Sequence, residues 1–305
     1  QLYKVNFFEF GRYAQQIKSQ NDPTYDKKAF ETILEIKGRE EHDKLIDMLN
    51  DINNMNIPIE ETVEKHFDLD NFLTWTAVNI LMDNMDTDAN NFYLYSPLNS
   101  EKWYILPWDY DGAWEYQREK NYIRPYQAGI SNYWGSLLHN RYFRTEKNVQ
   151  QLTDKLEELS EIINEETVEK QINEYADLIK PFLYRNPDIQ FLPVPNTSFE
   201  DELQKIKETP SKSMQRYIED LEKPKPFFMN EVETTNSELL FSWQISYDLQ
   251  MDDLFYKVTV AKDPNFTEIV EVKDNIRENF YTMKKPEDGL YFWEVTASDS
   301  KGNVQ

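Results

Sequence analysis

Residues 83–111 constrain what this chain can fold into more than any other stretch. The stretch opens with six acidic or amide side chains: Asp83, Asn84, Asp86, Asp88, Asn90 and Asn91. Two apolar segments follow, 92–95 and 103–106, separated by a turn-rich sequence of Ser, Pro and Asn. Alternating apolar segments joined in this way are typical of an antiparallel β-hairpin. We therefore expect a hairpin with acidic residues at its open end.

The open end of this hairpin carries the candidate site. A symmetric hairpin places Asn91 opposite Asp109, and directly paired residues hold their Cβ atoms roughly 5 Å apart. Asp86 lies on the loop that leads into the hairpin, and Asp111 points the same way as Asp109 if the strand stays extended. Oxygen ligands without Cys favour a hard ion such as Mg²⁺ or Mn²⁺. The alternative is a solvated strand end, and we expect Asp83 and Asp88 to cap or solvate the loop.

The spacing of these residues has a counterpart in protein kinases, where Asp and Asn separated by four residues precede a hairpin and a second, metal-binding Asp. In an acidic chain this spacing also arises by chance. A wider pattern resembles the CotH kinase family, atypical kinases of the spore-coat type, and it reads Asn84-x-Asp86-x-x-x-x-Asn91-x-Tyr93-x-Tyr95, Lys102-Trp103-Tyr104 and Pro107-Trp108-Asp109-x-Asp111. The resemblance covers about residues 1–223, from Leu2-Tyr3-Lys4 to the helix around Arg216. Asn90 departs from the pattern, because the family commonly has His there.

This resemblance implies an α+β fold for residues 1–223, with a mainly helical kinase-like large lobe that contains the metal hairpin. It implies that Asp86 is catalytic and accepts the proton of the attacking hydroxyl, and that Asn91, Asp109 and Asp111 hold the metal that bridges the phosphates of ATP. The implied acceptor is a protein, such as a coat or surface protein, at or outside the cell surface. The small lobe with the ATP-binding Lys would lie before residue 1. Lys4 and Lys37 are nearby, but we assign no cofactor-binding residue.

Residues 112–135 combine aromatic and basic side chains with weak periodicity. A long irregular segment in a compact domain is often functional, and kinases keep an activation or substrate segment at this position. Arg118, Lys120 and Arg124 are therefore candidates for phosphate or acidic-substrate contacts. The alternative is surface pairing with Asp and Glu.

Composition excludes several classes of partner and site. The 305 residues carry a formal net charge of −23 at pH 7, which disfavours nucleic acid and anionic membrane surfaces. Cysteine is absent, so disulfides and thiolate chemistry are excluded. No apolar run approaches the ~20 residues that span a bilayer, and no signal peptide is visible. We read the sequence as part of a longer protein of unassigned oligomeric state.

The rest of the chain shows a helical part and a strand-rich part. An apolar helix at 71–85, capped by Asp68 or Asp70, leads into the acidic loop. Further helices are expected at 136–142, 149–163, 167–183, 199–206 and 211–221. A Pro/Lys linker at 222–226 marks the domain boundary, so that 224–305 form a separate domain. Strands are expected there at 239–245, 255–261, 268–272, 280–283 and 290–297. This pattern resembles a fibronectin type III-like β-sandwich with Tyr291 as its corner tyrosine.

Three other functions remain open. Residues 86–97 imitate an EF-hand loop, but Asn91 and Pro97 stand where Gly and Glu are required. Paired acids and many Trp residues suggest a glycoside hydrolase, although no motif supports one. A catalytically inactive surface, adhesion or assembly protein could also keep the kinase-like fold. Such a protein should have lost Asp86, Asn91 or Asp109, and all three are present. The three histidines, His42, His66 and His139, are expected at the surface or at helix ends.

Overall fold

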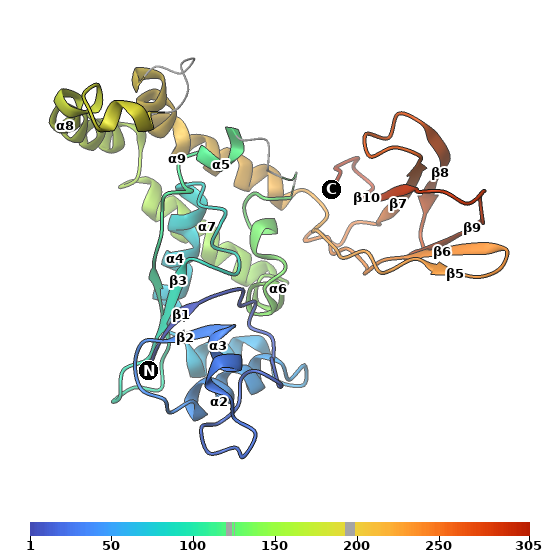
Figure 1. Cartoon of the computed structure of the whole chain (residues 1–305), viewed down its shortest axis with the longest axis horizontal. Coiled ribbons are helices and arrows are strands. Elements are labelled where there is room, and N and C mark those ends of the chain that lie inside the picture. Colours follow the sequence, from blue (N-terminus) through green and yellow to red (C-terminus); the bar gives the residue numbers. More distant parts are fainter. Residues whose placement is uncertain (120–123, 125, 193–198) are drawn as a thin grey trace. The chain divides into compact units, whose positions relative to one another are not determined.

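The computed structural model describes residues 1–119, 124, 126–192 and 199–305. It divides into two compact units, Gln1–Tyr217 and Ile218–Gln305. Helices and three small antiparallel sheets occur together (Figure 1), which confirms the α+β class. Among the described residues, no helix has the length and apolar character needed to cross a bilayer.

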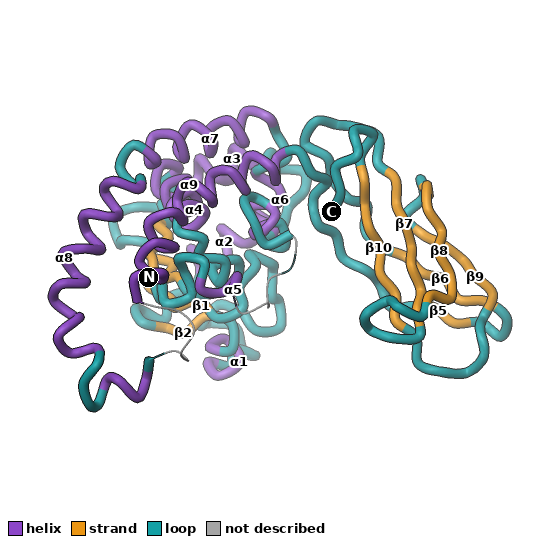
Figure 2. Tube along the Cα trace, turned by 90° about the horizontal axis from the view of Figure 1, so that it is seen from above, coloured by secondary structure: helices purple, strands orange, loops and turns teal. Residues whose placement is uncertain are grey.

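The first unit is mainly helical (Figure 2). Its helices are α1 (Lys27–Glu31), α2 (Asp43–Ile52), α3 (Ile59–His66), α4 (Leu69–Leu81), α5 (Tyr116–Glu119), α6 (Leu137–Tyr142), α7 (Glu146–Ser160), α8 (Glu165–Leu183) and α9 (Phe199–Leu221), with 3-10 turns at Ser131–Tyr133 and Asp188–Phe191. Its strands are β1 (Leu2–Val5), β2 (Leu34–Ile36), β3 (Phe92–Tyr95) and β4 (Tyr104–Pro107). α9 begins in this unit and ends in the second one.

The predicted hairpin is β3 and β4, and its second strand begins one residue later than expected. It forms the edge of a four-stranded antiparallel sheet in the order β2-β1-β3-β4. The hairpin turn is held by Lys44 of α2, whose ammonium donates to Ser96 Oγ at 3.2 Å, to the Pro97 carbonyl at 3.2 Å and to the Ser100 carbonyl at 2.6 Å. β2 was not expected, because its apolar residues extend a helical pattern from α1. Pairing with β1 selects the extended conformation there.

The apolar helix predicted before the acidic loop is α4. Of the two expected caps, it is Asp68 that caps the helix, by accepting a hydrogen bond from the Asn71 N–H at 3.0 Å. The helix is buried on most of its circumference and packs against α7 and β4. It ends at Leu81, earlier than the predicted Met85, because Asp83 takes a left-handed backbone conformation with φ of 51°. The acidic loop therefore starts one turn sooner than the sequence indicated.

The histidines are buried, which contradicts the expected surface positions, although His42 and His66 do lie at helix ends. His139 lies within α6 and is 1% exposed. Its ring centroid is 5.0 Å from that of Tyr133 and 5.1 Å from that of Phe72. Burial in this aromatic environment lowers the pKa of His139 to about 3. The residue is thus a neutral part of the hydrophobic core.

The second unit contains the predicted strand-rich part. β6 (Glu238–Ser242), β7 (Phe255–Ala261), β8 (Ile269–Ile276), β9 (Phe280–Lys284) and β10 (Phe292–Ser298) match the five expected strands, and β5 (Glu233–Thr234) is additional. They form two three-stranded antiparallel sheets, β10-β7-β8 and β5-β6-β9. The ring centroids of Trp243, after β6, and Tyr256, on β7, lie 5.4 Å apart, so one hydrophobic core serves both sheets.

Two details near the unit boundary differ from the sequence predictions. The helices expected at 199–206 and 211–221 are one helix, α9, with Pro210 inside it. Thr209 and Pro210 are both buried, and packing stabilises the helix where proline removes a backbone hydrogen bond. The expected Pro/Lys linker is packed as well. Lys225 is fully buried, and its N–H donates to the Tyr247 carbonyl at 2.7 Å.

Candidate functional site

The acidic loop after α4 is held by hydrogen bonds among buried residues. The Asn84 N–H donates to the Asn79 carbonyl at 2.9 Å, and the Asn84 side chain donates to Asn79 Oδ1 at 3.1 Å. The Thr87 hydroxyl donates to the Asn84 carbonyl at 2.8 Å and lies 2.9 Å from the Tyr133 hydroxyl. All four residues are buried. The loop is therefore a rigid platform for the exposed Asp86.

The segment that follows β1 ties the same loop to the sheet. Asn90 Oδ1 accepts a hydrogen bond from the Phe7 N–H at 2.8 Å, and the Ala89 carbonyl accepts one from the Phe8 N–H at 2.8 Å. Asn90 is the position at which the sequence departs from the CotH pattern. The amide oxygen takes a backbone donor here, so the loop keeps an anchor at this position.

Asp86 and Asn91 face each other across the loop. The Asn91 side-chain nitrogen donates to Asp86 Oδ2 at 2.8 Å, and this bond leaves the amide oxygen of Asn91 for another partner. Asn91 has φ of 58°, a conformation that Asn tolerates better than most residues. Loss of hydration raises the pKa of Asp86, the bond from Asn91 opposes this rise, and the charges of Asp111 and Asp109 reinforce it. The four residues thus share one electrostatic environment.

The register corrects one expectation about this site. The β3–β4 ladder ends with Phe92 opposite Pro107, so Asn91 and Asp109 are not a directly opposed pair. Asp109 leaves the strand with φ of 57°, and Asp109 and Asp111 are both exposed. Among the described residues, Asp86, Asp109 and Asp111 do not form a group of three carboxylates whose oxygens all lie within 4.8 Å. A cation here would therefore combine the Asn91 oxygen with some of these carboxylates.

Arg118, a candidate for phosphate contact, is bound to Asp83. Its Nε lies 2.7 Å from Asp83 Oδ2, and its Nη2 lies 2.7 Å from Asp83 Oδ1 and 2.7 Å from the Gln127 carbonyl. Asp83 is 4% exposed, so it does not solvate the loop as expected. Burial raises its pKa, and Arg118 opposes the rise. Asp88 is half-buried, and burial raises its pKa to about 6.

A second ion pair extends this network to α9. Arg216 hydrogen-bonds to Glu115, and its Nη1 lies 3.6 Å from Asp83 Oδ1. Glu115 is buried with φ of 64°, and the Lys212 ammonium lies 3.7 Å from it. The sequence reasoning missed this network. The sequence does contain a signal for it. On each side of the hairpin an acidic residue directly follows an apolar one, Asp83 after Met82 and Glu115 after Trp114, which indicates a buried acid.

The other basic candidates are Arg124, Lys120, Lys4 and Lys37. Arg124 is exposed, and Lys120 lies outside the described residues. The Lys4 ammonium lies 5.1 Å from the ring centroid of Trp108, and Lys37 pairs with Glu35 at 2.5 Å. Lys4 thus lies next to Trp108.

Comparison with known proteins shows which family the first unit belongs to. The family model described as CotH kinase protein matches residues 1–215, which include the whole hairpin and its acidic loop. The chain belongs to the CotH kinase family. It is also similar to Inner spore coat protein H of Bacillus subtilis (strain 168), with 28% identity over 190 residues. That alignment covers 60% of this chain and 49% of the relative, so the chain spans about half the length of the curated relative. Family membership suggests an atypical kinase-like function.

Proposed function

We propose that the protein is an atypical protein kinase that transfers the γ-phosphoryl group of ATP to a protein hydroxyl with Mg²⁺ or Mn²⁺. The hydrogen bond between Asn91 and Asp86, in a loop that also feels the charges of Asp109 and Asp111, is the observation that carries this proposal. Because the nitrogen of this amide is held by the catalytic acid, its oxygen is left for another partner. Oxygen ligands of this kind suit a hard divalent ion.

Each residue then has a distinct role. Asp86 orients the acceptor hydroxyl and takes its proton as the oxygen forms a bond to the γ-phosphorus and the bond to ADP breaks. The raised pKa of Asp86 makes it a better proton acceptor than an ordinary carboxylate. Asn91, Asp109 and Asp111 would hold the metal, which neutralises charge on the phosphates. Phosphoryl transfer depends mainly on positioning and charge neutralisation, and the buried anchors of the loop supply the positioning.

The relative supports a proposal for the acceptor and the location. Its printed name describes an inner spore coat protein. We propose that the acceptor of this kinase is a coat or surface protein and that it acts at or outside the cell surface. An inactive adhesion or assembly protein of the same fold is the second candidate. The presence of Asp86, Asn91 and Asp109 in the expected loop and hairpin supports activity.

For the second unit we propose a fibronectin type III-like sandwich that acts as a spacer or adhesion module. The Tyr291 hydroxyl donates to the Glu287 carbonyl at 2.9 Å, which is the bond expected of a corner tyrosine. A Cβ added at Gly289 would lie 3.3 Å from the Tyr291 ring, so glycine lets the ring fold back over the chain. The two sheets that share one core agree with this proposal.

Phosphate incorporation in the full-length natural protein tests the kinase proposal. Asp86→Asn and Asp109→Asn should each lower incorporation from γ-labelled ATP with Mn²⁺ or Mg²⁺, Asp86→Asn by about 10²–10⁴-fold. Asp70→Asn is the matched control, because Asp70 is an exposed acid of the same unit and should leave labelling unchanged. Undiminished labelling in Asp86→Asn or Asp109→Asn would contradict the assignment.

A further inference from the structure

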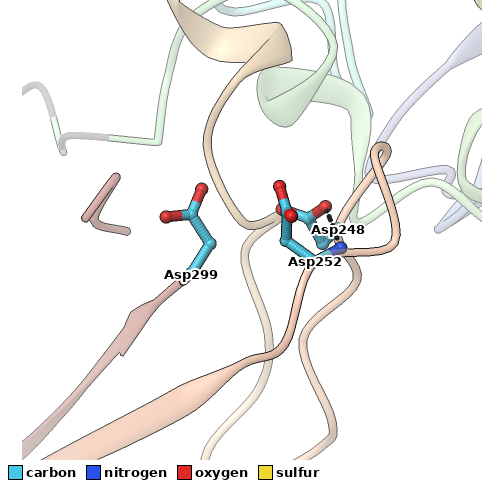
Figure 3. Close-up of side chains that lie close together, drawn as sticks. All are labelled: Asp248, Asp252 and Asp299. Atoms are coloured by element: carbon cyan, nitrogen blue, oxygen red, sulfur yellow. Dashed lines mark hydrogen bonds between the residues drawn. The ribbon is translucent and has the colours of Figure 1, made fainter. Parts of the chain in front are cut away.

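A group of three aspartates lies in the second unit, which contains none of the residues assigned to phosphoryl transfer. Asp248 and Asp252 lie between β6 and β7, and Asp299 follows β10. One carboxylate oxygen from each lies within 4.8 Å of the others (Figure 3). Asp248 and Asp299 are buried, with 3% and 5% of their surface exposed. Three negative groups in so small a volume repel one another unless positive charge is supplied.

The two buried aspartates are held by their own loops. Asp248 Oδ1 accepts hydrogen bonds from the N–H groups of Gln250 and Asp252, both at 2.9 Å. Asp299 accepts from the N–H groups two and four residues further on, at 2.9 and 2.8 Å. Asp263 accepts from its own loop in a similar way, yet it belongs to no such group. This loop geometry therefore fixes the carboxylates but does not itself indicate a ligand.

The second carboxylate oxygen of Asp248 does indicate a ligand. Oδ2 is inaccessible to solvent and, within the described part of the chain, has no hydrogen-bond donor. The dashed bond in Figure 3 occupies Oδ1 of Asp248. Buried polar atoms nearly always have a partner, and a buried carboxylate oxygen without one is costly. A cation among the three carboxylates would supply the missing interaction.

The neighbouring lysines do not fill this role. The Lys301 ammonium lies 2.8 Å from Asp252 Oδ2 and pairs with that carboxylate. The buried Lys225 ammonium acts on Asp248 electrostatically, but it donates to the Asp220 carbonyl and lies 3.3 Å from Asp220 Oδ1. These contacts leave Asp248 Oδ2 without a donor.

We propose that Asp248, Asp252 and Asp299 form a calcium site that joins the loop after β6 to the loop after β10. Only oxygen atoms are offered, which selects a hard cation over zinc or copper. Calcium accepts irregular oxygen sets at 2.3–2.6 Å and tolerates opposed oxygens about 5 Å apart, whereas magnesium demands a tighter octahedron. Carbonyl groups and water would complete the shell. The ion stabilises the second unit and takes no part in phosphoryl transfer.

Calcium titration of the whole protein tests this site. Isothermal titration calorimetry of metal-free protein with CaCl₂ should show binding that persists in Asp109→Asn, a variant of the hairpin site. Asp248→Asn should weaken calcium binding at least ten-fold, while Asp263→Asn, the matched loop aspartate outside the group, should bind as the wild type does. Calcium should also increase the protection of amides in the second unit against hydrogen exchange.

Each result decides the matter. Absence of heat and of added protection at millimolar calcium overturns the proposal, and so does equal binding in Asp248→Asn. Loss of binding in Asp109→Asn would assign the ion to the hairpin instead, and this readout does not depend on the folding of Asp248→Asn. Magnesium binding as tight as calcium binding would overturn the choice of ion.

Discussion

The ion pair between Asp83 and Arg118 provides the sharpest test of how the acidic loop is held. Arg118→Met keeps the length of the side chain and removes its charge. Removing one partner of a buried pair costs about 3–5 kcal/mol because the other charge stays buried. The Arg118 side chain is 20% exposed and Arg216 Nη1 remains 3.6 Å from Asp83, so we expect the lower end, about 3 kcal/mol.

The reverse change should cost less. In Asp83→Asn, Arg118 keeps its hydrogen bond to the Gln127 carbonyl and can reach water, so we expect a loss of about 1 kcal/mol. The double variant should lose about 2 kcal/mol, which gives a coupling energy of about 2 kcal/mol. The free energy of opening is measured by hydrogen exchange of peptides from residues 83–91, so that unfolding of the second unit is not counted. Arg39→Met, a change at an exposed arginine, is the control, with an effect within about 0.5 kcal/mol.

The pH dependence adds a signature of the buried charge. Burial raises the folded-state pKa of Asp83 above its usual 3.8, and loss of Arg118 raises this pKa further. A group with a raised folded pKa binds its proton more tightly when folded, so stability is lost as pH rises from 3.8 through the folded value. The deficit of Arg118→Met should thus be full at neutral pH and should shrink in acid. Additive losses, or a deficit independent of pH, would refute the role of this pair.

Two further predictions concern the packed units. Burial lowers the folded pKa of His139 to about 3, so the unfolded imidazole takes up a proton between pH 7 and pH 5 while the folded one does not. This one residue should therefore cost the wild type about 2 kcal/mol of stability over that range, and His139→Phe should remove that contribution. Urea unfolding of the first unit at both pH values measures this loss. An equal change in the free energy of unfolding between pH 7 and pH 5 in the variant would contradict the prediction. Tyr291→Phe should cost the second unit about 1 kcal/mol by thermal unfolding, through loss of the bond to Glu287. Tyr281→Phe, which loses a bond to the side chain of Glu271, should cost less, and the opposite order would argue against a corner tyrosine.

Local patterns in the sequence were sufficient for the elements around the candidate site. Alternation and turn residues predicted β3 and β4 nearly to the residue, because both depend on neighbours in the chain. Asp68 was one of the two predicted helix caps, since capping is a contact between residues three apart. The spacing of Asp86 and Asn91 likewise identified two side chains that do share a hydrogen bond. The family match over residues 1–215 confirms the resemblance that this pattern indicated.

What the sequence by itself determined, then, is the position of most helices and strands, the α+β class and the acidic loop of a CotH kinase family member. The tertiary structure alone decided which charged and polar side chains are buried or paired with one another. Arg118 looks like any surface arginine in the sequence, yet it binds an aspartate 35 residues away. His139 looks polar but is a core residue, and Asp299 meets Asp248 and Asp252 from a distant strand. The physical reason is that burial and electrostatic interaction depend on which groups folding brings together, and residues far apart in the chain leave no periodic trace of such meetings.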